Sequence, residues 1–316
     1  MAKKVFVDGS EGTTGLRIFE RFEGRNDIEI LKIDSELRKD PTERAKLINA
    51  SDVTFLCLPD AAAIEAVSLC TNPDTIIIDT STAHRTSDGW TYGFPELDKE
   101  HRDAIKTSKR IANPGCHASG FVSLVYPLTK SGMIPADTRL CCFSLTGYSG
   151  GGKKKIAEYE SNDRDIELSS PRQYGLSQNH KHLKEMQKIC GLEKAPLFSP
   201  IICDFYSGME VSVYLYKEMF DKDVTPESIN ELYREYYKGS KLVKVTKPGI
   251  EEELGGFIGS NNLSGKDYLE IIVTGNEDRI IVTSRFDNLG KGASAAAVQS
   301  MNIALGFDET TGLVAE

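Results

Sequence analysis

Short apolar runs alternate with segments of helical pattern over the first 112 residues, and this alternation constrains the fold more than any other feature. The runs have the length and the Val, Ile and Phe content of buried strands, at Lys4–Asp8, Ile28–Ile33, Val53–Leu58, Thr75–Asp79 and Arg110–Ala112. The helical segments lie between them, at Thr13–Glu23, Pro41–Ala50, Asp60–Cys70 and Pro95–Thr107. Strands joined through helices form a parallel sheet, so the pattern predicts an α/β fold that opens with a doubly wound, Rossmann-type domain over residues 1–116.

The pattern changes after this domain. Longer strand-like runs with polar alternation follow, at Thr138–Thr146, Met209–Tyr216, Tyr268–Thr274 and Arg279–Phe286, with helices near His182–Cys190 and Pro226–Lys238. They predict an α+β domain with a mixed or antiparallel sheet over residues 117–290. Residues 239–267 are rich in Gly, Ser, Asn and Lys and are expected to be loops. The C-terminal segment, about 291–316, contains an amphipathic helix near Gly292–Leu305 that is expected to pack back on the first domain.

Composition limits the partners of the chain. Its 316 residues suggest about two domains, and its net charge of −9 argues against a nucleic-acid partner. Its apolar stretches are shorter than the ~18 residues needed to span a bilayer, and the N-terminus enters a strand without a signal-peptide pattern. The seven cysteines, an odd number with no C-x-x-C pair, indicate a reducing compartment. We therefore expect a cytoplasmic protein with no nucleic-acid or membrane partner.

A glycine turn, Gly9-Ser-Glu-Gly12-Thr-Thr-Gly15, follows the first strand-like run directly. Glycines let the backbone approach a pyrophosphate at a helix N-terminus, although glycine turns also join strands to helices for steric reasons. The spacing here is G-x-x-G-x-x-G, and its position directly after an N-terminal strand favours the binding interpretation. The expected dinucleotide-binding residues are Gly9, Ser10, Gly12, Thr13, Thr14 and Gly15.

The segment after the second run bears on which dinucleotide binds. Asp34 lies near the position where an acid holds the ribose 2′-OH of NAD. Arg38 and Lys39 follow it and can pair with the 2′-phosphate of NADP, or they can belong to a loop before the helix that starts at Pro41. These residues alone leave NAD and NADP open.

The most informative short motif is Asn113-Pro114-Gly115-Cys116. Pro and Gly end the preceding strand, and the apolar stretch after Cys116 predicts a helix. Unpaired N–H groups at a helix N-terminus favour an anion, so we expect a lowered pKa for the Cys116 thiol and a nucleophilic thiolate. The alternative is a buried structural cysteine.

Three further clusters carry reactive or charged side chains. The loop Ser149–Gly152 precedes three lysines and can bind an anion or simply lead into a solvated helix. His180 and His182 would point to the same face of an extended chain, as an acid/base pair, as zinc ligands or as surface side chains. We expect no metal, because no further ligand stands nearby at metal spacing. Arg85 follows a strand end and can bind a carboxylate or phosphate, or have a structural role.

Several motifs spread from residue 5 to about 306 combine into a family resemblance. They are the N-terminal VFVDGSEGTTGL, Leu56–Asp60 (LCLPD), Ser81–Arg85 (STAHR), Gly89–Glu96 (GWTYGFPE), Asn113–Cys116 (NPGC), Gly147–Gly152 (GYSGGG), His180–His182 (HKH) and Asp287–Gly292 (DNLGKG). Together they resemble the short-form (type 2) N-acetyl-γ-glutamyl-phosphate reductases. Two positions depart from the expected pattern: His117-Ala118 stands where Tyr-Pro is expected, and Lys184 stands where a proline is expected before the glutamate.

The resemblance implies NADPH-dependent reduction of a small-molecule acyl phosphate in arginine biosynthesis, in a homodimer or homotetramer. It makes Cys116 the nucleophile and the H-x-H pair the acid/base, with His180 preferred over His182. The remaining expected roles are Tyr174 lining the site, Glu185 orienting an imidazole, Arg85, Ser149 and Gly150 binding the substrate, Asn288 reaching the cofactor, and Arg38 contacting the 2′-phosphate. The rival interpretations are an aspartate-semialdehyde dehydrogenase-like reductase of another acyl phosphate, a cofactor-binding regulatory protein and a zinc hydrolase.

Overall fold

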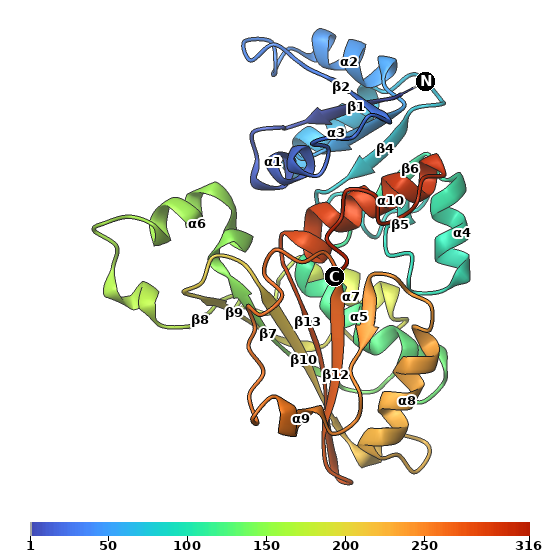
Figure 1. Cartoon of the computed structure of the whole chain (residues 1–316), viewed down its shortest axis with the longest axis vertical. Coiled ribbons are helices and arrows are strands. Elements are labelled where there is room, and N and C mark those ends of the chain that lie inside the picture. Colours follow the sequence, from blue (N-terminus) through green and yellow to red (C-terminus); the bar gives the residue numbers. More distant parts are fainter. Residues whose placement is uncertain (1) are drawn as a thin grey trace. The chain divides into compact units, whose positions relative to one another are not determined.

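The computed structural model describes residues 2–316 of the chain and divides them into two compact units. The first runs to Gly115 and also takes Ala293–Leu313; the second comprises Cys116–Gly292 with Val314–Glu316. Figure 1 labels the helices and strands of both units.

The first unit is built on a parallel sheet of order β2-β1-β3-β4-β6-β5. Its strands are β1 (Lys3–Asp8), β2 (Ile28–Leu31), β3 (Val53–Leu56), β4 (Ile76–Asp79), β5 (Thr91–Tyr92) and β6 (Arg110–Ala112). The helices are α1 (Thr13–Glu20), α2 (Pro41–Ala50), α3 (Asp60–Leu69), α4 (Lys99–Thr107) and α10 (Ala295–Leu305). The predicted doubly wound domain is thereby confirmed, with several element ends shorter than expected.

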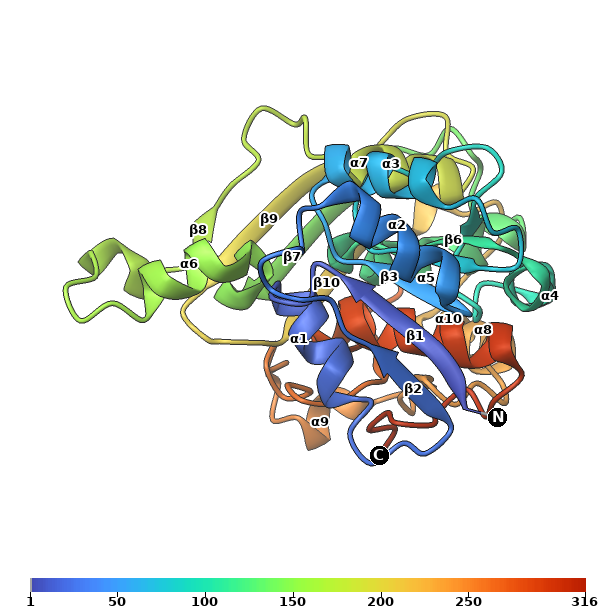
Figure 2. The same ribbon diagram turned by 90° about the horizontal axis from the view of Figure 1, so that it is seen from above.

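Alternate residues of the strands supply a hydrophobic core on each face of this sheet, as expected for strands buried on both sides. Val5 and Val7 pack in a cluster with residues of α1, α4 and α10, whereas Phe6 packs in a second cluster with residues of α2 and α3. Figure 2 shows α2 and α3 near each other above the strands. The carboxyl ends of β1, β3 and β4 therefore meet at one edge of the sheet, where ligands bind in open α/β folds.

Two predicted helices of this unit differ from the structure. The helix expected from Pro95 begins at Lys99 because the Asp98 side chain caps it and accepts from the N–H of His101 at 2.8 Å. The helix expected over Gly292–Leu305 is preceded by a π-helical turn, Gly290–Ser294, and its residues Ala295–Ile303 are all buried. It is therefore not amphipathic in the usual sense, because its polar side chains are buried as well as its apolar ones.

The second unit has a mixed sheet of order β11-β12-β13-β10-β7-β9-β8. Its strands are β7 (Cys141–Gly147), β8 (Arg172–Gln173), β9 (Leu197–Cys203), β10 (Met209–Tyr216), β11 (Val243–Val245), β12 (Leu269–Gly275) and β13 (Arg279–Phe286). The pairs β7–β9 and β11–β12 are parallel and the other pairs are antiparallel. The predicted mixed sheet is confirmed.

Helix α5 (Cys116–Lys130) packs on β10 and β13 and against α7 (His182–Ile189). The other helices of this unit are α6 (Gly152–Tyr159), α8 (Pro226–Tyr236) and α9 (Ile250–Glu253) (Figure 1). Gly120 allows the close approach of α5 to the sheet, because a Cβ there would lie 2.3 Å from Cγ2 of Val211. The expectation of loops throughout 239–267 is wrong, since this stretch contains β11 and α9. No helix among the described residues is long and apolar enough to cross a bilayer.

Candidate active site

Cys116 is the first residue of α5, so the structure places it where the sequence predicted, at a helix N-terminus. The site around it belongs to the second unit. Gly292 approaches Cys116 so closely that a Cβ at this glycine would lie 3.1 Å from the cysteine Cβ. A side chain at this position would require the neighbouring atoms to shift by a few tenths of an ångström, so glycine suits the close approach.

The next residue, His117, is buried and links two hydroxyl groups, an arrangement that the sequence analysis missed. Its Nδ1 lies 2.7 Å from Oγ of Ser144 on β7, and its Nε2 lies 2.6 Å from the hydroxyl oxygen of Tyr174. Burial lowers the pKa of His117 to about 3, and the neighbouring charge of His180 contributes in the same direction. The ring is therefore neutral at any pH near 7.

His180 and His182 lie in one cluster with His117. The ring centroids of His180 and His182 are 4.7 Å apart and the rings meet edge to face. Those of His117 lie 5.6 Å and 5.5 Å from the two. The expectation that the pair would share one face of an extended chain is wrong, because Lys181 is helical, with φ −59° and ψ −26°, and α7 begins at His182. The chain turns here, and the turn brings the two rings together instead.

Tyr174 connects this cluster to the cysteine. Burial raises the pKa of Tyr174, and the charge of the Cys116 thiolate raises it further, so the phenol keeps its proton. An electrostatic effect of this kind requires that the two side chains lie near each other. Glu185 is buried on α7, three residues after His182, which is the spacing of side chains on one helix face. Its proposed role of orienting an imidazole remains a prediction.

The glycine-rich loop predicted to bind the substrate is the 3-10 turn Tyr148–Gly151 that leads into α6. Asn288 holds it: its side-chain amide donates to Oγ of Ser149 at 3.0 Å and accepts from the N–H of Gly208 at 2.9 Å. Ser149 and Asn288 are both buried. The contacts of Asn288 thus fix the loop, while its predicted contact with the cofactor and those of Ser149 and Gly150 with the substrate remain predictions.

In the first unit, the glycine turn packs closely against neighbouring backbone, which excludes side chains at two of its positions. Gly9 has φ +86°, and a Cβ there would lie 2.3 Å from the Cys57 carbonyl oxygen; at Gly15 it would lie 2.7 Å from the Gly9 carbonyl oxygen. Gly12 is the N-cap residue of α1 and brings no side chain to the helix end. In the described part of the chain, no side chain caps the first N–H groups of α1, so the turn is compatible with a phosphate at this helix end, and the binding of a dinucleotide there remains a prediction.

Arg38 extends to this turn and pairs with Glu11. The Arg38 guanidinium, which is expected to bind the 2′-phosphate, therefore lies beside the glycine turn. Its contact with the cofactor remains a prediction. The Asp34 carboxylate makes a local hydrogen bond, because it accepts from the N–H of Glu36 at 2.9 Å.

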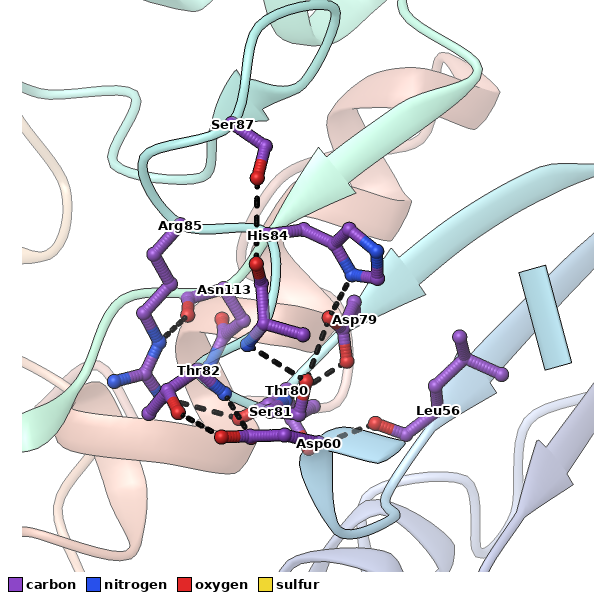
Figure 3. Close-up of polar contacts among 11 residues, drawn as sticks. Leu56, Asp60, Asp79, Thr80, Ser81, Thr82, His84, Arg85, Ser87 and Asn113 are labelled. Carbon is purple, nitrogen blue, oxygen red and sulfur yellow. Dashed lines mark hydrogen bonds and ion pairs between the residues drawn. The ribbon is translucent and has the colours of Figure 1, made fainter. Parts of the chain in front are cut away.

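The STAHR motif forms a tightly bonded loop at the carboxyl end of β4 (Figure 3). Asp79 accepts from the N–H and the hydroxyl of Ser81, and its Oδ2 lies 2.6 Å from Nδ1 of His84. The Arg85 guanidinium donates to the backbone carbonyls of Asn113 at 2.9 Å and Thr80 at 3.1 Å. Arg85 thus joins the ends of β4 and β6, which is the structural role that the sequence left open, and its contact with a substrate remains a prediction.

Two protein-family models match the chain. The model described as the NAD binding domain of semialdehyde dehydrogenase matches residues 3–106, and the model described as its dimerisation domain matches residues 116–288. A Nostoc protein named N-acetyl-gamma-glutamyl-phosphate reductase 2 is 42% identical, and the alignment covers 98% of this chain and 99% of that protein. A Pseudomonas putida protein of the same name is 38% identical, over 96% of each chain.

Solved structures show the same fold. Aspartate semialdehyde dehydrogenase II from Vibrio cholerae, complexed with ASA, superposes with a TM-score of 0.72 at 14% identity and covers 97% of this chain and 99% of its own. The aspartate semialdehyde dehydrogenase from Francisella tularensis gives 0.71 at 16% identity, over 96% and 99%. At these identities the likeness establishes the fold alone.

Proposed function

The chain belongs to the semialdehyde dehydrogenase family, among the N-acetyl-γ-glutamyl-phosphate reductases, and on this premise we propose how its residues reduce N-acetyl-γ-glutamyl phosphate to N-acetylglutamate 5-semialdehyde, a step of arginine biosynthesis. The observation that carries the proposal is Cys116 in the first turn of α5, with Tyr174 near it and a histidine cluster beside Tyr174. This is the arrangement of an activated nucleophile with an acid/base group.

The reaction begins at the sulfur of Cys116. The thiolate attacks the acyl carbon, the bond from that carbon to the phosphate oxygen breaks, and a thioester remains on the cysteine as phosphate leaves. The N–H groups at the start of α5 face the negative charge that develops on the acyl oxygen. After reduction of the thioester, the thiohemiacetal collapses to the aldehyde, and the carbon–sulfur bond breaks to restore the thiolate.

One histidine of the pair serves as acid and base. It takes the proton from the Cys116 thiol before the attack and returns it to the departing phosphate. His117 is unsuited to this role, because its pKa of about 3 makes it a poor proton acceptor. We assign the role to His180, with His182 in substrate binding.

The cofactor is NADPH, which supplies the hydride when it is bound. The residues of the first unit that would hold it are the glycine turn Gly9–Gly15, whose backbone fits the pyrophosphate, and Arg38, whose guanidinium is suited to the 2′-phosphate. The seven cysteines are all free thiols, which suits a reducing compartment, so we place the reaction in the cytoplasm.

We also propose that the protein works as a homodimer or a higher homo-oligomer. Val211 contacts α5 through Gly120, so Tyr214 and Tyr216, which lie an odd number of residues further along β10, point to the opposite face of the sheet. Both tyrosines are exposed, at 40% and 56%, and Leu197 on the same face is 65% exposed. An exposed apolar face of a sheet is typical of a surface that a second subunit covers.

The experiment that tests the function runs the reaction backwards. We expect phosphate-dependent reduction of NADP with N-acetylglutamate semialdehyde, and a far lower kcat/KM with aspartate semialdehyde. Cys116→Ser should lose turnover by orders of magnitude, because a serine hydroxyl is not ionised at neutral pH. Cys70→Ser is the matched control and should keep the wild-type rate. Preference for aspartate semialdehyde, or an active Cys116→Ser variant, contradicts the proposal.

A further inference from the structure

His117 lies between two hydroxyl groups that come from distant parts of the second unit. Ser144 is on β7 and wholly buried, and Tyr174 is in the segment that follows β8. The imidazole lies 2.7 Å from the first hydroxyl and 2.6 Å from the second. A neutral imidazole has one N–H and one bare nitrogen, so it donates to one of these hydroxyls and accepts from the other.

The surroundings of Ser144 decide which way the chain of hydrogen bonds runs. Within residues 2–316, Nδ1 of His117 is the one hydrogen-bonding partner of its hydroxyl group. If Nδ1 carried the proton, the Ser144 O–H would be buried without an acceptor. If Ser144 donates, only lone pairs are left unused, and a buried donor without an acceptor is the more costly defect. The proton of His117 therefore belongs on Nε2.

With that proton on Nε2, the Tyr174 oxygen accepts from His117 and its own O–H must point elsewhere. Tyr174 hydrogen-bonds to the ring of His117, the residue next to Cys116, and lies within electrostatic reach of the Cys116 thiolate. We propose that His117 is a positioning residue: by donating from Nε2 to Tyr174, it turns the tyrosine O–H toward the Cys116 thiolate and the oxygen of the substrate bound beside it. The inference rests on the proposed role of Cys116 as the nucleophile and adds a hydrogen-bond donor to it.

The position of His117 in the helix suits this role. The residue directly follows the nucleophile in α5, and its ring packs edge-on against Phe198 at 5.2 Å between centroids. The ring is therefore held on three sides, by Ser144, Tyr174 and Phe198, and it cannot rotate without breaking a hydrogen bond. A tyrosine O–H held in this way loses little rotational freedom when it donates to the thiolate or to the substrate.

Two amide substitutions separate the two hydrogen bonds of His117. The amide of His117→Asn occupies the place of Nδ1 and keeps the contact with Ser144, but it is too short to reach Tyr174. The amide of His117→Gln reaches the place of Nε2 and can still donate to Tyr174. A donor to the thiolate favours the ionised form, so His117→Asn should raise the pH midpoint of Cys116 alkylation by iodoacetamide by about one unit, a tenfold change in the ionisation constant.

His117→Gln should restore most of that shift, and His101→Asn, at a histidine on α4 of the first unit, is the matched control that should leave the midpoint unchanged. The double variant His117→Asn/Tyr174→Phe decides whether the effect passes through the tyrosine. If it does, Tyr174→Phe alone shifts the midpoint as much as His117→Asn, and the double variant shifts it no further. Equal effects of Asn and Gln, or additive shifts in the double variant, overturn the proposal. Thermal unfolding of each variant identifies any that fails to fold.

The alkylation measurement needs neither substrate nor cofactor. A protein that does not act on N-acetylglutamate semialdehyde but shows the predicted midpoints would therefore contradict the proposed function and leave this inference standing. An unshifted midpoint in His117→Asn, with full reductase activity, would do the reverse.

Discussion

At the scale of single residues, the three histidines of the cluster lie in different environments. His117 is buried between two hydroxyls and has a pKa near 3, whereas His180 precedes α7 and His182 is its first residue. A group that exchanges protons near pH 7 needs a pKa near the working pH. The environment of His117 therefore makes it a fixed hydrogen-bonding link, and the proposed mechanism assigns proton transfer to His180 and His182 instead.

The first prediction distinguishes the members of that pair. His180→Ala should lower kcat by roughly 10² or more, the usual effect of losing an acid/base group. His182→Ala should mainly raise KM. Steady-state kinetics of both variants checks the assignment. The opposite order would mean that the two roles are exchanged, and near-wild-type rates in both would reject the pair.

A second prediction concerns Arg38 and Lys39. Charge-assisted contacts contribute about 1.5–3 kcal/mol each, so Arg38→Ala/Lys39→Ala should reduce the preference for NADPH over NADH by at least about tenfold. The ratio of kcat/KM for the two cofactors measures this. Lys46→Ala, at an exposed lysine on α2 that pairs with Glu43, is a control for the loss of a surface charge. An unchanged ratio in the double variant would direct attention to Ser35 and the Thr13–Thr14 turn.

A third prediction follows from the pKa of His117. The unfolded chain binds a proton at this histidine near its ordinary pKa of 6.5, while the folded protein does so only near pH 3. Stability from this residue is therefore complete above pH 6.5 and is lost as the pH falls toward 3. Between pH 7 and 5 the loss is about 2 kcal/mol. Urea unfolding at both pH values should show a correspondingly smaller loss in His117→Gln, and an equal loss would contradict the assignment.

At the scale of elements, α5 contains a proline that its neighbour α8 compensates. Pro127 lacks the N–H that would bond to the carbonyl of Ser123 four residues earlier. The Tyr237 hydroxyl, at the end of α8, donates to that carbonyl at 2.7 Å. Tyr233 on α8 donates to the next carbonyl, of Leu124, at 2.6 Å. The two helices are thus joined where the helical hydrogen bonds of α5 are interrupted.

The fourth prediction compares the two tyrosines, because the Ser123 carbonyl lacks its helical N–H partner and the Leu124 carbonyl does not. Tyr237→Phe leaves a buried carbonyl unsatisfied and should lower the free energy of unfolding by about 1–3 kcal/mol. Tyr233→Phe is the matched control and should cost less, because the Leu124 carbonyl can still accept from the N–H of Leu128. Denaturant unfolding of both variants tests this, and a larger cost at Tyr233 would contradict it.

The helices and strands also show which parts of the fold can be predicted from the sequence. Long runs in which polar and apolar residues alternate, such as β10 and β13, were predicted with the observed bounds. Strand β9 was missed because Pro200 lies in its middle, and a proline within a run argues against a strand. At the site, the Pro-Gly turn before Cys116 and the apolar stretch after it were enough to predict that this cysteine lies at a helix N-terminus. The link through His117 did not, because Ser144 and Tyr174 lie 27 and 57 residues away in sequence and no local pattern joins them.

At the scale of the whole molecule, assembly is the property that the proposed sheet surface controls. The exposed residues Leu197, Tyr214 and Tyr216 lie on one face of the second unit's sheet, opposite α5. The fifth prediction is that Tyr214→Lys raises the dissociation constant of the homo-oligomer at least tenfold, because a charge would be buried without a partner. Analytical ultracentrifugation measures it. Phe257→Lys, at an exposed phenylalanine outside the strands, is the control, and an unchanged assembly in Tyr214→Lys would exclude this face.

The discontinuity of the first unit has a consequence for protein synthesis. The chain leaves this unit at Gly115 and returns only at Ala293, and the returning helix α10 supplies Ala297, Val298 and Met301 to the core on one face of the parallel sheet. At about 5–20 residues per second, a ribosome needs on the order of ten seconds to add the intervening segment. During that interval one apolar face of the parallel sheet is not yet covered by α10. We therefore expect the newly emerged N-terminal part to be a substrate for chaperones until α10 has been synthesised.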